Sequence, residues 1–483
     1  MPRIIFHIDV NAAFLSWSAV KMVRAGQPDI RLVPSVVSGA PDDRRSIITA
    51  ASMPAKELGI KTAQPLSMAL RTCPSLVIVR GDWEWYKRCS DGFISICRSY
   101  SPVLQQFSID ECFIDMSFRC GGRDPVAVAT QLKDEIKARL GFTVNVGVGS
   151  SKLLAKMASD FEKPDKVHTL WENEVPEKMW PLGVRDLLWV GKKTEERLTA
   201  YGIRTIGDLA RLGMGSLTRL VGQKFALQLH ENANGRDDTP VETEVAEAKS
   251  YSAERTFPKD YTDPRDIDRV LFHVACIVAH RIRKDDFRAS TVSMFIKYKD
   301  FTVAQKQTSL SRPTDITAVI LHEARHMLTE IWDAVTPIRQ VGLGVSKLTH
   351  ESYEQMSLFE DPKLAYYREW DRQYDEQRAR AEDARMLAYE RKSTPVDTPA
   401  PPPAHTPGRN AGTSSVKRSG PADDALVFAY GSGEEALAAA KKAVKGHSAY
   451  RFHRVTLPDG TDCFEVVEDQ KVLERHTVTR KNR

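Results

Sequence analysis

The sequence predicts a multidomain α+β protein, and three observations support this prediction. The chain has 483 residues, which is too long for one hydrophobic core and suggests three to five domains. Strand-like and helix-like apolar patterns alternate over the first 167 residues, as in a sheet covered by helices. The pattern is helical over residues 168–240 and returns to strands and helices over residues 245–350. We therefore expect several α+β and helical modules in series.

The composition is that of globular modules, with 42% apolar and 28% charged residues. The net charge of +5 excludes a simple polybasic binder but permits a basic groove. No apolar run approaches the roughly 20 residues of a membrane span, and no secretory signal is visible. Seven scattered cysteines, without a C-x-x-C pair, suit a reducing compartment better than a disulfide framework. We expect a cytoplasmic, monomeric protein without membrane contact.

The first module alternates between strands and helices from its first residues. Strands are predicted at 3–9, 46–50, 76–79, 103–107, 112–116 and 143–148, and helices at about 12–24, 53–58, 66–72, 83–99, 125–140 and 151–160.

Two adjacent carboxylates interrupt one of these strand patterns. Asp110 and Glu111 stand in the run Ser108–Met116, between Ile109 and Phe113. Adjacent side chains of a strand point to opposite faces, but a tight turn can bring both towards one cation. Acids in an apolar setting are costly unless a metal or a base neutralises them. The alternative is a solvated hairpin tip, where like charges are tolerated.

A third acid ends the first strand. Residues 4–14 read as an apolar strand that reaches Asp9 and continues through Val10 towards Phe14. A strand with one carboxylate beside a hairpin with two forms a three-acid cluster. Such a cluster suits a pair of divalent metals that carry out in-line phosphoryl transfer.

These two segments carry a family resemblance. The patterns D-x-N-x-x-F at residues 9–14 and S-x-D-E-x-F at residues 108–113 resemble the catalytic signature of Y-family translesion DNA polymerases, and the polymerase IV (DinB-like) branch is the nearest match. The resemblance covers about residues 1–360. It implies a right-hand polymerase that adds deoxynucleotides opposite damaged template. Its substrates would be primer–template DNA and deoxynucleoside triphosphates.

The resemblance also implies a division into domains. The ranges expected for each part are as follows: a palm at 1–167 with fingers inserted at about 11–75, a helix-hairpin-helix thumb at 168–240, a little finger at 245–350, a clamp-binding motif and charged helix at 351–392, a disordered linker at 393–424, and a small α/β module at 425–483.

The same resemblance assigns roles to individual residues of the palm. Asp110 and Glu111 would be catalytic and, with Asp9 and the Val10 carbonyl, would hold two Mg²⁺ ions. Phe14 would stack under the sugar and exclude a 2′-hydroxyl, the group that distinguishes RNA precursors from DNA precursors.

Lys56 and Lys163 are the expected triphosphate contacts. Lys163 precedes Pro164 in a segment that resembles the family's K-P-N-G element, although Asp165 and Lys166 replace its last two positions. The nucleotide-gripping segment of the family normally carries a tyrosine and an arginine where this chain has Met53 and Lys56. Lysine keeps the charge but loses the bidentate fork, so triphosphate binding would be rearranged. A solvated surface charge is the alternative for each lysine.

The expected DNA contacts of the thumb lie in a glycine turn. Gly191, Lys192 and Lys193 precede a helix in a segment that resembles a helix-hairpin-helix, whose turn presents backbone N–H groups to a DNA phosphate. A glycine between two helices is often only a cap. In the little finger, residues 321–326 match the H-E-x-x-H zinc-protease pattern, and a solvated helix face explains them without a metal.

The segment Gln355–Phe359 resembles the pentapeptide by which bacterial polymerases bind the sliding clamp. Gln355 would supply hydrogen bonds, and Leu358 and Phe359 would be the apolar anchors. The alternative is that both apolar residues pack the following helix onto the little finger. Farther on, the sequence predicts a strand at 426–430, a helix at 434–445 and a hairpin near residue 459, without a recognisable function. A catalytically idle DNA- and clamp-binding scaffold remains the rival function, because of Met53 and Lys56.

Overall fold

The structure is a computed structural model that describes residues 3–39, 45–244, 247–350 and 362–392, and four strands between residues 426 and 478. The chain divides into two compact units, Met1–Ala400 and Pro401–Arg483. Within the described residues, no helix is both long and apolar enough to cross a membrane.

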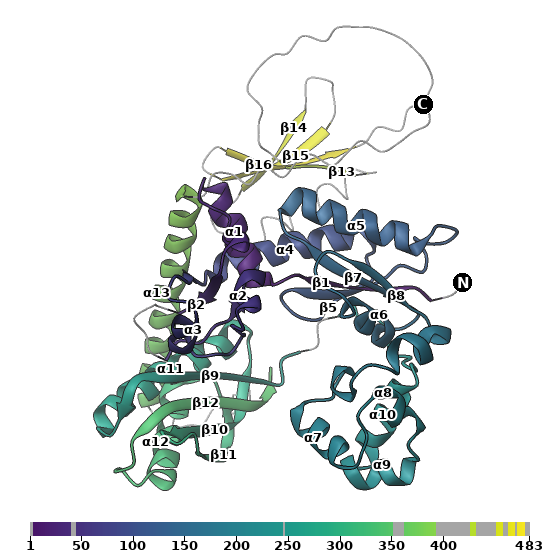
Figure 1. The fold of residues 1–483 in the computed structure, drawn as a ribbon. Coiled ribbons are helices and arrows are strands. Elements are labelled where there is room, and N and C mark those ends of the chain that lie inside the picture. The colour runs from purple at the N-terminus through teal and green to yellow at the C-terminus, as the bar shows by residue number, and fades with distance from the viewer. Residues whose placement is uncertain are drawn as a thin grey trace. The chain divides into compact units, whose positions relative to one another are not determined.

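A five-stranded sheet forms the palm, in the order β5-β6-β1-β7-β8. Its strands are β1 (Ile5–Val10), β5 (Leu104–Gln106), β6 (Glu111–Asp115), β7 (Val144–Gly149) and β8 (Val167–Leu170). Helices α4 (Trp83–Tyr100) and α5 (Pro125–Leu140) cover one face, and α6 (Lys152–Ser159) covers the other (Figure 1). Because both faces are covered, β1 is apolar on both sides, apart from His7 and Asp9.

Even-numbered and odd-numbered residues of β1 face different helices. Phe6 and Ile8 are buried in the core that contains α4 and α5, together with Trp17 of α1 (Ala13–Arg24). Ile5 is buried beside Ala155 of α6. Side chains alternate along a strand, so His7 and Asp9 lie on the α6 face. The palm thus presents its first carboxylate on the side of the sheet that α6 covers.

The fingers contain a small sheet in the order β3-β2-β4. Its elements are β2 (Ser35–Ser38), β3 (Ala50–Ala51), α2 (Met53–Glu57), α3 (Leu66–Thr72) and β4 (Val77–Arg80). The strand predicted at 46–50 is therefore shorter and later than expected, since only residues 50 and 51 pair with β2.

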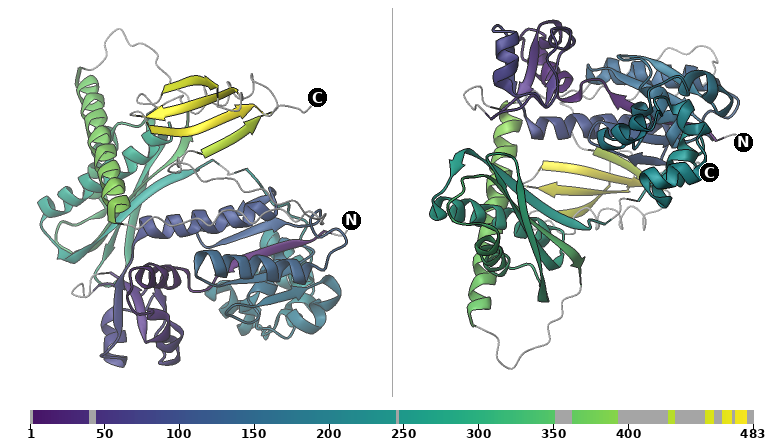
Figure 2. Two further views of the ribbon diagram at one scale, coloured as in Figure 1. Left: turned by 90° about the horizontal axis from the view of Figure 1, so that it is seen from above. Right: turned by 60° about the horizontal axis from the view of Figure 1, so that its bottom comes forward.

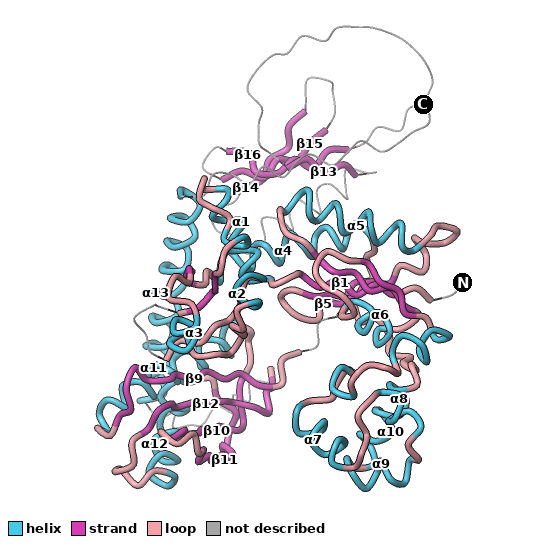
Figure 3. The backbone as a smooth tube through the Cα atoms, in the orientation of Figure 1, coloured by secondary structure: helices cyan, strands magenta, loops and turns pink. Residues whose placement is uncertain are grey.

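The thumb is helical, as predicted, but it begins later than residue 168. Residues 168–170 belong to β8, which pairs with β7 in the palm sheet. After short turns come α7 (Lys192–Ala200), α8 (Ile206–Arg211), α9 (Met214–Val221) and α10 (Gln223–Ala233), which Figure 3 shows as helices joined by loops. Leu154 and Met157 of α6 are buried in the thumb core, so α6 joins thumb and palm.

The little finger is an antiparallel sheet with helices on one face, in the order β11-β10-β12-β9. Its elements are β9 (Ser250–Tyr261), α11 (Pro264–Lys284), β10 (Arg288–Tyr298), β11 (Val303–Thr314), α12 (Thr317–Ile331) and β12 (Ile338–Thr349). On α12 the apolar residues Ile320 and Ala324 are buried, whereas His322 and His326 are exposed. The H-E-x-x-H pattern is thus a solvated helix face.

Helix α13 (Pro362–Lys392) packs on the little finger (Figure 2). Asp371, which is only 2% exposed, accepts hydrogen bonds from the Thr317 N–H (3.0 Å) and the Thr317 hydroxyl (2.5 Å). It thereby caps α12, whose own N-cap residue provides no side-chain hydrogen bond. Arg283 of α11 contacts Asp371 at 3.3 Å and Asp375 at 2.7 Å. The charged helix is therefore anchored by one buried carboxylate, Asp371, and by partly buried ion pairs with Arg283.

The C-terminal unit contains a sheet in the order β13-β16-β15-β14. Its strands are β13 (Leu426–Tyr430), β14 (Arg451–Thr456), β15 (Asp462–Glu468) and β16 (Lys471–Val478). The predicted strand at 426–430 is present, and β14 and β15 pair antiparallel around the predicted hairpin. The sequence patterns did not reveal β16, which runs parallel to β13. The helix predicted at 434–445 lies outside the described residues.

Candidate active site

The register of the palm sheet brings the three carboxylates together. Asp9 of β1 is directly opposite Glu111 of β6, so both side chains lie on the α6 face. Asp110 lies in the turn just before β6, where its carbonyl accepts a hydrogen bond from the Val10 N–H (2.9 Å). The N–H groups of Phe107 and Ser108 both donate to the Glu111 carbonyl, at 3.0 and 3.2 Å. This tight turn is what lets adjacent acids share one site.

Asp110 is the carboxylate of the three without a basic partner among the described residues. Burial raises its pKa, a hydrogen bond from the Ser108 hydroxyl (2.5 Å) lowers it, and the charges of Asp9 and Glu111 raise it further. The net shift of the pKa is upward, mainly because the carboxyl group is buried, and repulsion by the charges of Asp9 and Glu111 adds to it. A cation placed between these side chains would relieve that repulsion.

Glu111 is held by two basic groups. His7 donates from Nε2 at 3.0 Å, and Lys156 of α6 lies at 3.2 Å. Burial alone would raise the pKa of Glu111, but the His7 hydrogen bond and the Lys156 charge lower it to about 2. Burial lowers the pKa of His7, so its imidazole is neutral at pH 7. His7 Nδ1 lies 2.8 Å from the Ser159 hydroxyl oxygen, and this hydroxyl donates to the Lys156 carbonyl at 2.8 Å.

Asp9 is paired with Lys163, which also contacts Asp160 at 2.8 Å. The loop that carries Lys163 is attached to the end of β1 through Asn11, whose Oδ1 accepts a hydrogen bond from the Asp165 N–H (2.9 Å). The altered positions after Pro164 are thus compatible with a loop that places Lys163 beside the carboxylates.

The donor set fits hard divalent cations, although it is not arranged around one. Asp9, Asp110 and Glu111 offer carboxylate oxygens, and the Val10 carbonyl follows Asp9 on the same strand; these are the ligands that Mg²⁺ prefers. Among the described residues, however, no three acidic, histidine or cysteine side chains stand in metal-holding geometry. Lysines engage two of the carboxylates instead, so binding of a metal would exchange these contacts.

Phe14 follows β1 at the start of α1 and lies in an aromatic cluster. Its ring stacks on Tyr86 at 4.9 Å, meets Trp17 edge-on at 5.9 Å and lies 6.3 Å from Trp83. The side chain is half-buried rather than part of the closed core. A flat aromatic surface that is open on one side can support a ligand ring.

The remaining predicted residues lie in other domains or outside the described chain. Lys56 and Met53 are exposed on α2 in the fingers. Gly191 is the N-cap residue of α7, and Lys192 and Lys193 form its first turn. Gln355, Leu358 and Phe359 lie outside the described residues.

Sequence patterns did not reveal four residues that surround the carboxylates. They are His7, Asn11, Lys156 and Ser159. In the sequence, Lys156 stands out only because it shares a helical face with Lys152. A polar residue within the apolar run Ile4–Val10 was the one available signal for His7.

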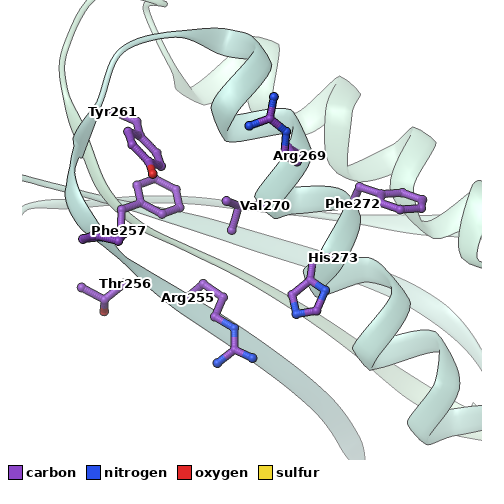
Figure 4. A pocket seen from close by; sticks show the side chains of 9 residues that line it. Arg255, Thr256, Phe257, Tyr261, Arg269, Val270, Phe272 and His273 are labelled. Carbon is purple, nitrogen blue, oxygen red and sulfur yellow. The ribbon is translucent and has the colours of Figure 1, made fainter. Parts of the chain in front are cut away.

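A separate cavity of about 520 Å³ lies in the little finger, between β9 and α11. Figure 4 shows Arg255 and His273 facing the same space beside Phe257 and Tyr261. Burial, and the charges of Arg255 and Arg378, lower the pKa of His273. None of the carboxylates lines this cavity, so it is not the catalytic site.

A palm with carboxylates at the junction of two strands, a helical thumb and an α+β little finger define a right-hand polymerase. Sequence models match at three places: the impB/mucB/samB family at residues 8–160, its C-terminal domain at residues 248–358, and the thumb domain of DNA polymerase-iota at residues 185–237.

The matches to individual relatives span most of each relative's length. The DNA polymerase IV of Clostridium acetobutylicum is 36% identical over 362 residues, which are 75% of this chain and 91% of the relative. DNA polymerase IV 1 of Bacillus subtilis is 34% identical over 360 residues, 74% of this chain and 85% of the relative. A solved Y-family DNA polymerase chimera of Dbh and Dpo4 shares the fold, with a TM-score of 0.64 and 22% identity over 72% of this chain and all of the other.

The chain belongs to the Y family of DNA polymerases, in its DNA polymerase IV (DinB-like) branch. It is a DNA-directed DNA polymerase of the translesion type, and the predicted α+β right-hand architecture is confirmed. Its substrates are DNA and nucleotides, and polymerases of this family normally need a divalent metal.

Proposed function

We propose that nucleotidyl transfer takes place at Asp9, Asp110 and Glu111, which with the Val10 carbonyl hold two Mg²⁺ ions. The observation that carries this proposal is the β1–β6 register, which sets Asp9 opposite Glu111 beside the turn of Asp110. When bound, the ions would activate the primer hydroxyl and stabilise the charge on the transferred phosphate. Burial and the neighbouring charges of Asp9 and Glu111 raise the pKa of Asp110, and a cation at this place would offset both effects.

The protein groups around the carboxylates would orient them and then bind the nucleotide. His7 would fix one orientation of Glu111, because its ring lies between the Glu111 carboxylate (3.0 Å from Nε2) and the Ser159 hydroxyl (2.8 Å from Nδ1). Lys163 forms an ion pair with Asp9. A triphosphate offers a denser negative charge, so Lys163 would transfer to it. Lys56 on α2 would contact the same triphosphate from the fingers.

Phe14 would select the sugar. Its ring has Tyr86 behind it at 4.9 Å, so it cannot retreat from a bulkier sugar without disturbing that pair. A ribose 2′-hydroxyl pressed against such a supported ring meets steric repulsion. The chain would therefore prefer deoxynucleotides.

The thumb and the segment after the little finger would hold the DNA and the sliding clamp. The N–H groups of Lys192 and Lys193 have no hydrogen-bond partner among the described residues and are available to a DNA phosphate. Gln355, Leu358 and Phe359 would bind a clamp pocket, and tethering there would raise the effective concentration of primer ends.

Primer extension with carboxamide variants tests the catalytic assignment. Asp110→Asn and Glu111→Gln remove one charge each with little change of volume, and each should reduce incorporation by roughly a thousandfold or more, the effect of several kcal/mol. DNA affinity should change little, because it comes from distributed phosphate contacts. Asp115→Asn is the matched control on the same strand, since asparagine can still accept the Ser117 N–H bond (2.9 Å). Substantial extension by either site variant would remove the assignment.

The rival function is a DNA- and clamp-binding scaffold without catalysis. The exposed Met53 and Lys56 on α2 motivate it, since this methionine cannot hydrogen-bond a phosphate. The two hypotheses differ in one measurement on the parent protein. A scaffold would bind primer–template but fail to extend it at any Mg²⁺ or nucleotide concentration.

A further inference from the structure

Trp189 is the largest side chain in a strained backbone conformation among the described residues. Its φ is 76°, in the left-handed region that bulky side chains avoid. Its neighbours impose this conformation: Leu187 and Val190 are both buried in the thumb core, and the Val190 N–H donates to the Leu187 carbonyl at 3.0 Å. The backbone thus turns Trp189 outward while its neighbours point inward.

The Trp189 indole makes few packing contacts that could compensate this strain. Trp189 is 55% exposed, and its N–H has no hydrogen-bond partner among the described residues. The ring contact that the structure gives it is an edge-on approach to Phe107, with centroids 6.5 Å apart. Phe107 is itself 43% exposed. An exposed aromatic side chain whose backbone strain is not compensated by packing contacts indicates a binding role.

The two rings lie between two sites already assigned to DNA chemistry. Phe107 belongs to the catalytic turn, because its N–H donates to the Glu111 carbonyl. Trp189 stands two residues before Gly191, the N-cap of α7, where the N–H groups of Lys192 and Lys193 are free among the described residues. The Trp189–Phe107 contact thus joins the turn that carries the carboxylates to the segment that leads into α7.

We infer that Trp189, supported by Phe107, is a binding surface for the primer strand and packs against the deoxyribose of a nucleotide upstream of the reacting end. Bases of a paired primer are stacked inside the duplex, so the strand offers its sugars and phosphates at its edge. The α7 N–H groups suit a phosphate, and an indole ring suits the apolar face of the adjoining sugar. This inference rests on the proposed function, since it takes the DNA path from the carboxylates.

The alternative is that the Trp189–Phe107 contact only holds the thumb against the palm. Trp189→Gly separates the two roles, because glycine adopts the observed φ without strain. If Trp189 binds the primer, the glycine variant should melt at or above the parent temperature and bind primer–template about thirtyfold more weakly, the effect of a tryptophan hot spot. If the contact is only a latch, the variant should lose stability and keep its DNA affinity.

The decisive experiment measures primer–template affinity by fluorescence anisotropy without nucleotide. One 2′-O-methyl sugar is moved through the upstream primer positions. We expect the parent and Trp189→Phe to lose affinity at one shared position and Trp189→Gly to show no such position. Ala334→Gly is the matched control, because Ala334 also has a positive φ (59°) but lies in the little finger. It should match the parent at every position.

An identical position profile in the parent and in Trp189→Gly would overturn the inference, and so would unchanged affinity for unmodified DNA. Neither readout requires catalysis. Primer extension by the parent, run in parallel, tests the proposed function separately, so a failure of one is distinguishable from a failure of the other.

Discussion

Phe14→Ala should let the polymerase accept ribonucleotides while it still incorporates deoxynucleotides. The ring stacks on Tyr86 at 4.9 Å and meets Trp17 at 5.9 Å, so a firm aromatic layer supports it from behind. Removal of the ring opens space on the substrate side without touching the carboxylates. The expected change is therefore in sugar selection rather than in the chemistry.

The size of the effect follows from the packing. Forcing an extra group against a packed ring costs about 1–3 kcal/mol, and removal of the Phe14 ring should raise relative ribonucleotide incorporation by roughly 5- to 150-fold. A fully buried phenylalanine would cost about 3–5 kcal/mol of stability on truncation. Phe14 is half-buried and has ring pairs worth about 0.5–1.5 kcal/mol each, so we expect a loss of about 2 kcal/mol.

The assay is single-nucleotide primer extension with paired deoxy- and ribonucleoside triphosphates, together with thermal melting. Tyr86→Phe is the control, because it keeps the ring beneath Phe14 and removes only the hydrogen bond between its hydroxyl and Ser18 (2.7 Å). It should discriminate as the parent does. If Phe14→Ala melts like the parent and still rejects ribonucleotides, both the gate and the packing role of this ring are wrong.

Three further predictions concern other parts of the chain. Asp371→Ala leaves the Thr317 N–H without its acceptor and breaks its ion pair with Arg283, so the free energy of unfolding of the little finger should fall by about 3 kcal/mol. Hydrogen exchange in the first turn of α12 should become faster, and unchanged exchange would contradict this prediction. The pKa of Glu111 is lowered from 4.5 to about 2, so its contribution to the stability of the metal-free protein, present above pH 4.5, should be lost as the pH falls towards 2. The stability of Glu111→Gln should therefore fall less than that of the parent between pH 4.5 and pH 2. The same pH dependence of stability in both proteins would refute this prediction. The Leu358→Ala/Phe359→Ala double variant should synthesise normally without the clamp and lose stimulation by a loaded clamp; equal stimulation would show that this segment is not the tether.

Local patterns were enough to predict the strands that carry the proposed catalytic carboxylates. An apolar run that ends in Asp9, and an acid pair inside the next such run, mark strands whose ends carry charge, and the spacing of the residues suggested the family. The antiparallel register between Asp9 and Glu111 then follows once the two runs pair. Local residue patterns thus predicted that these carboxylates lie at the ends of strands.

The supporting contacts could not be predicted in this way, because their partners are far apart in the sequence. His7 meets Glu111 across 104 residues and Ser159 across 152 residues, and no pattern marks either pairing. The φ of Trp189 arises from the burial of two neighbouring residues, although the nearby Gly191 would be the expected position for an unusual turn. Helix α13 is rich in charged residues and resembles a solvated helix in the sequence. Its contacts with α11 are long-range ones: Asp371 pairs with Arg283, and the Trp370 ring lies 5.8 Å from the Phe272 ring.

The anchoring of α13 determines how residues 351–361 are attached to the rest of the chain. At one end, the His350 ring lies 4.0 Å from the Phe287 ring, and its Nδ1 is 2.8 Å from the Asp286 carbonyl. At the other end, α13 begins at Pro362 and is fixed through Asp371. The described residues on either side of this segment, His350 and Pro362, are therefore both attached to the little finger. A chain truncated after residue 350 would leave Arg283 without its two carboxylate partners, Asp371 and Asp375.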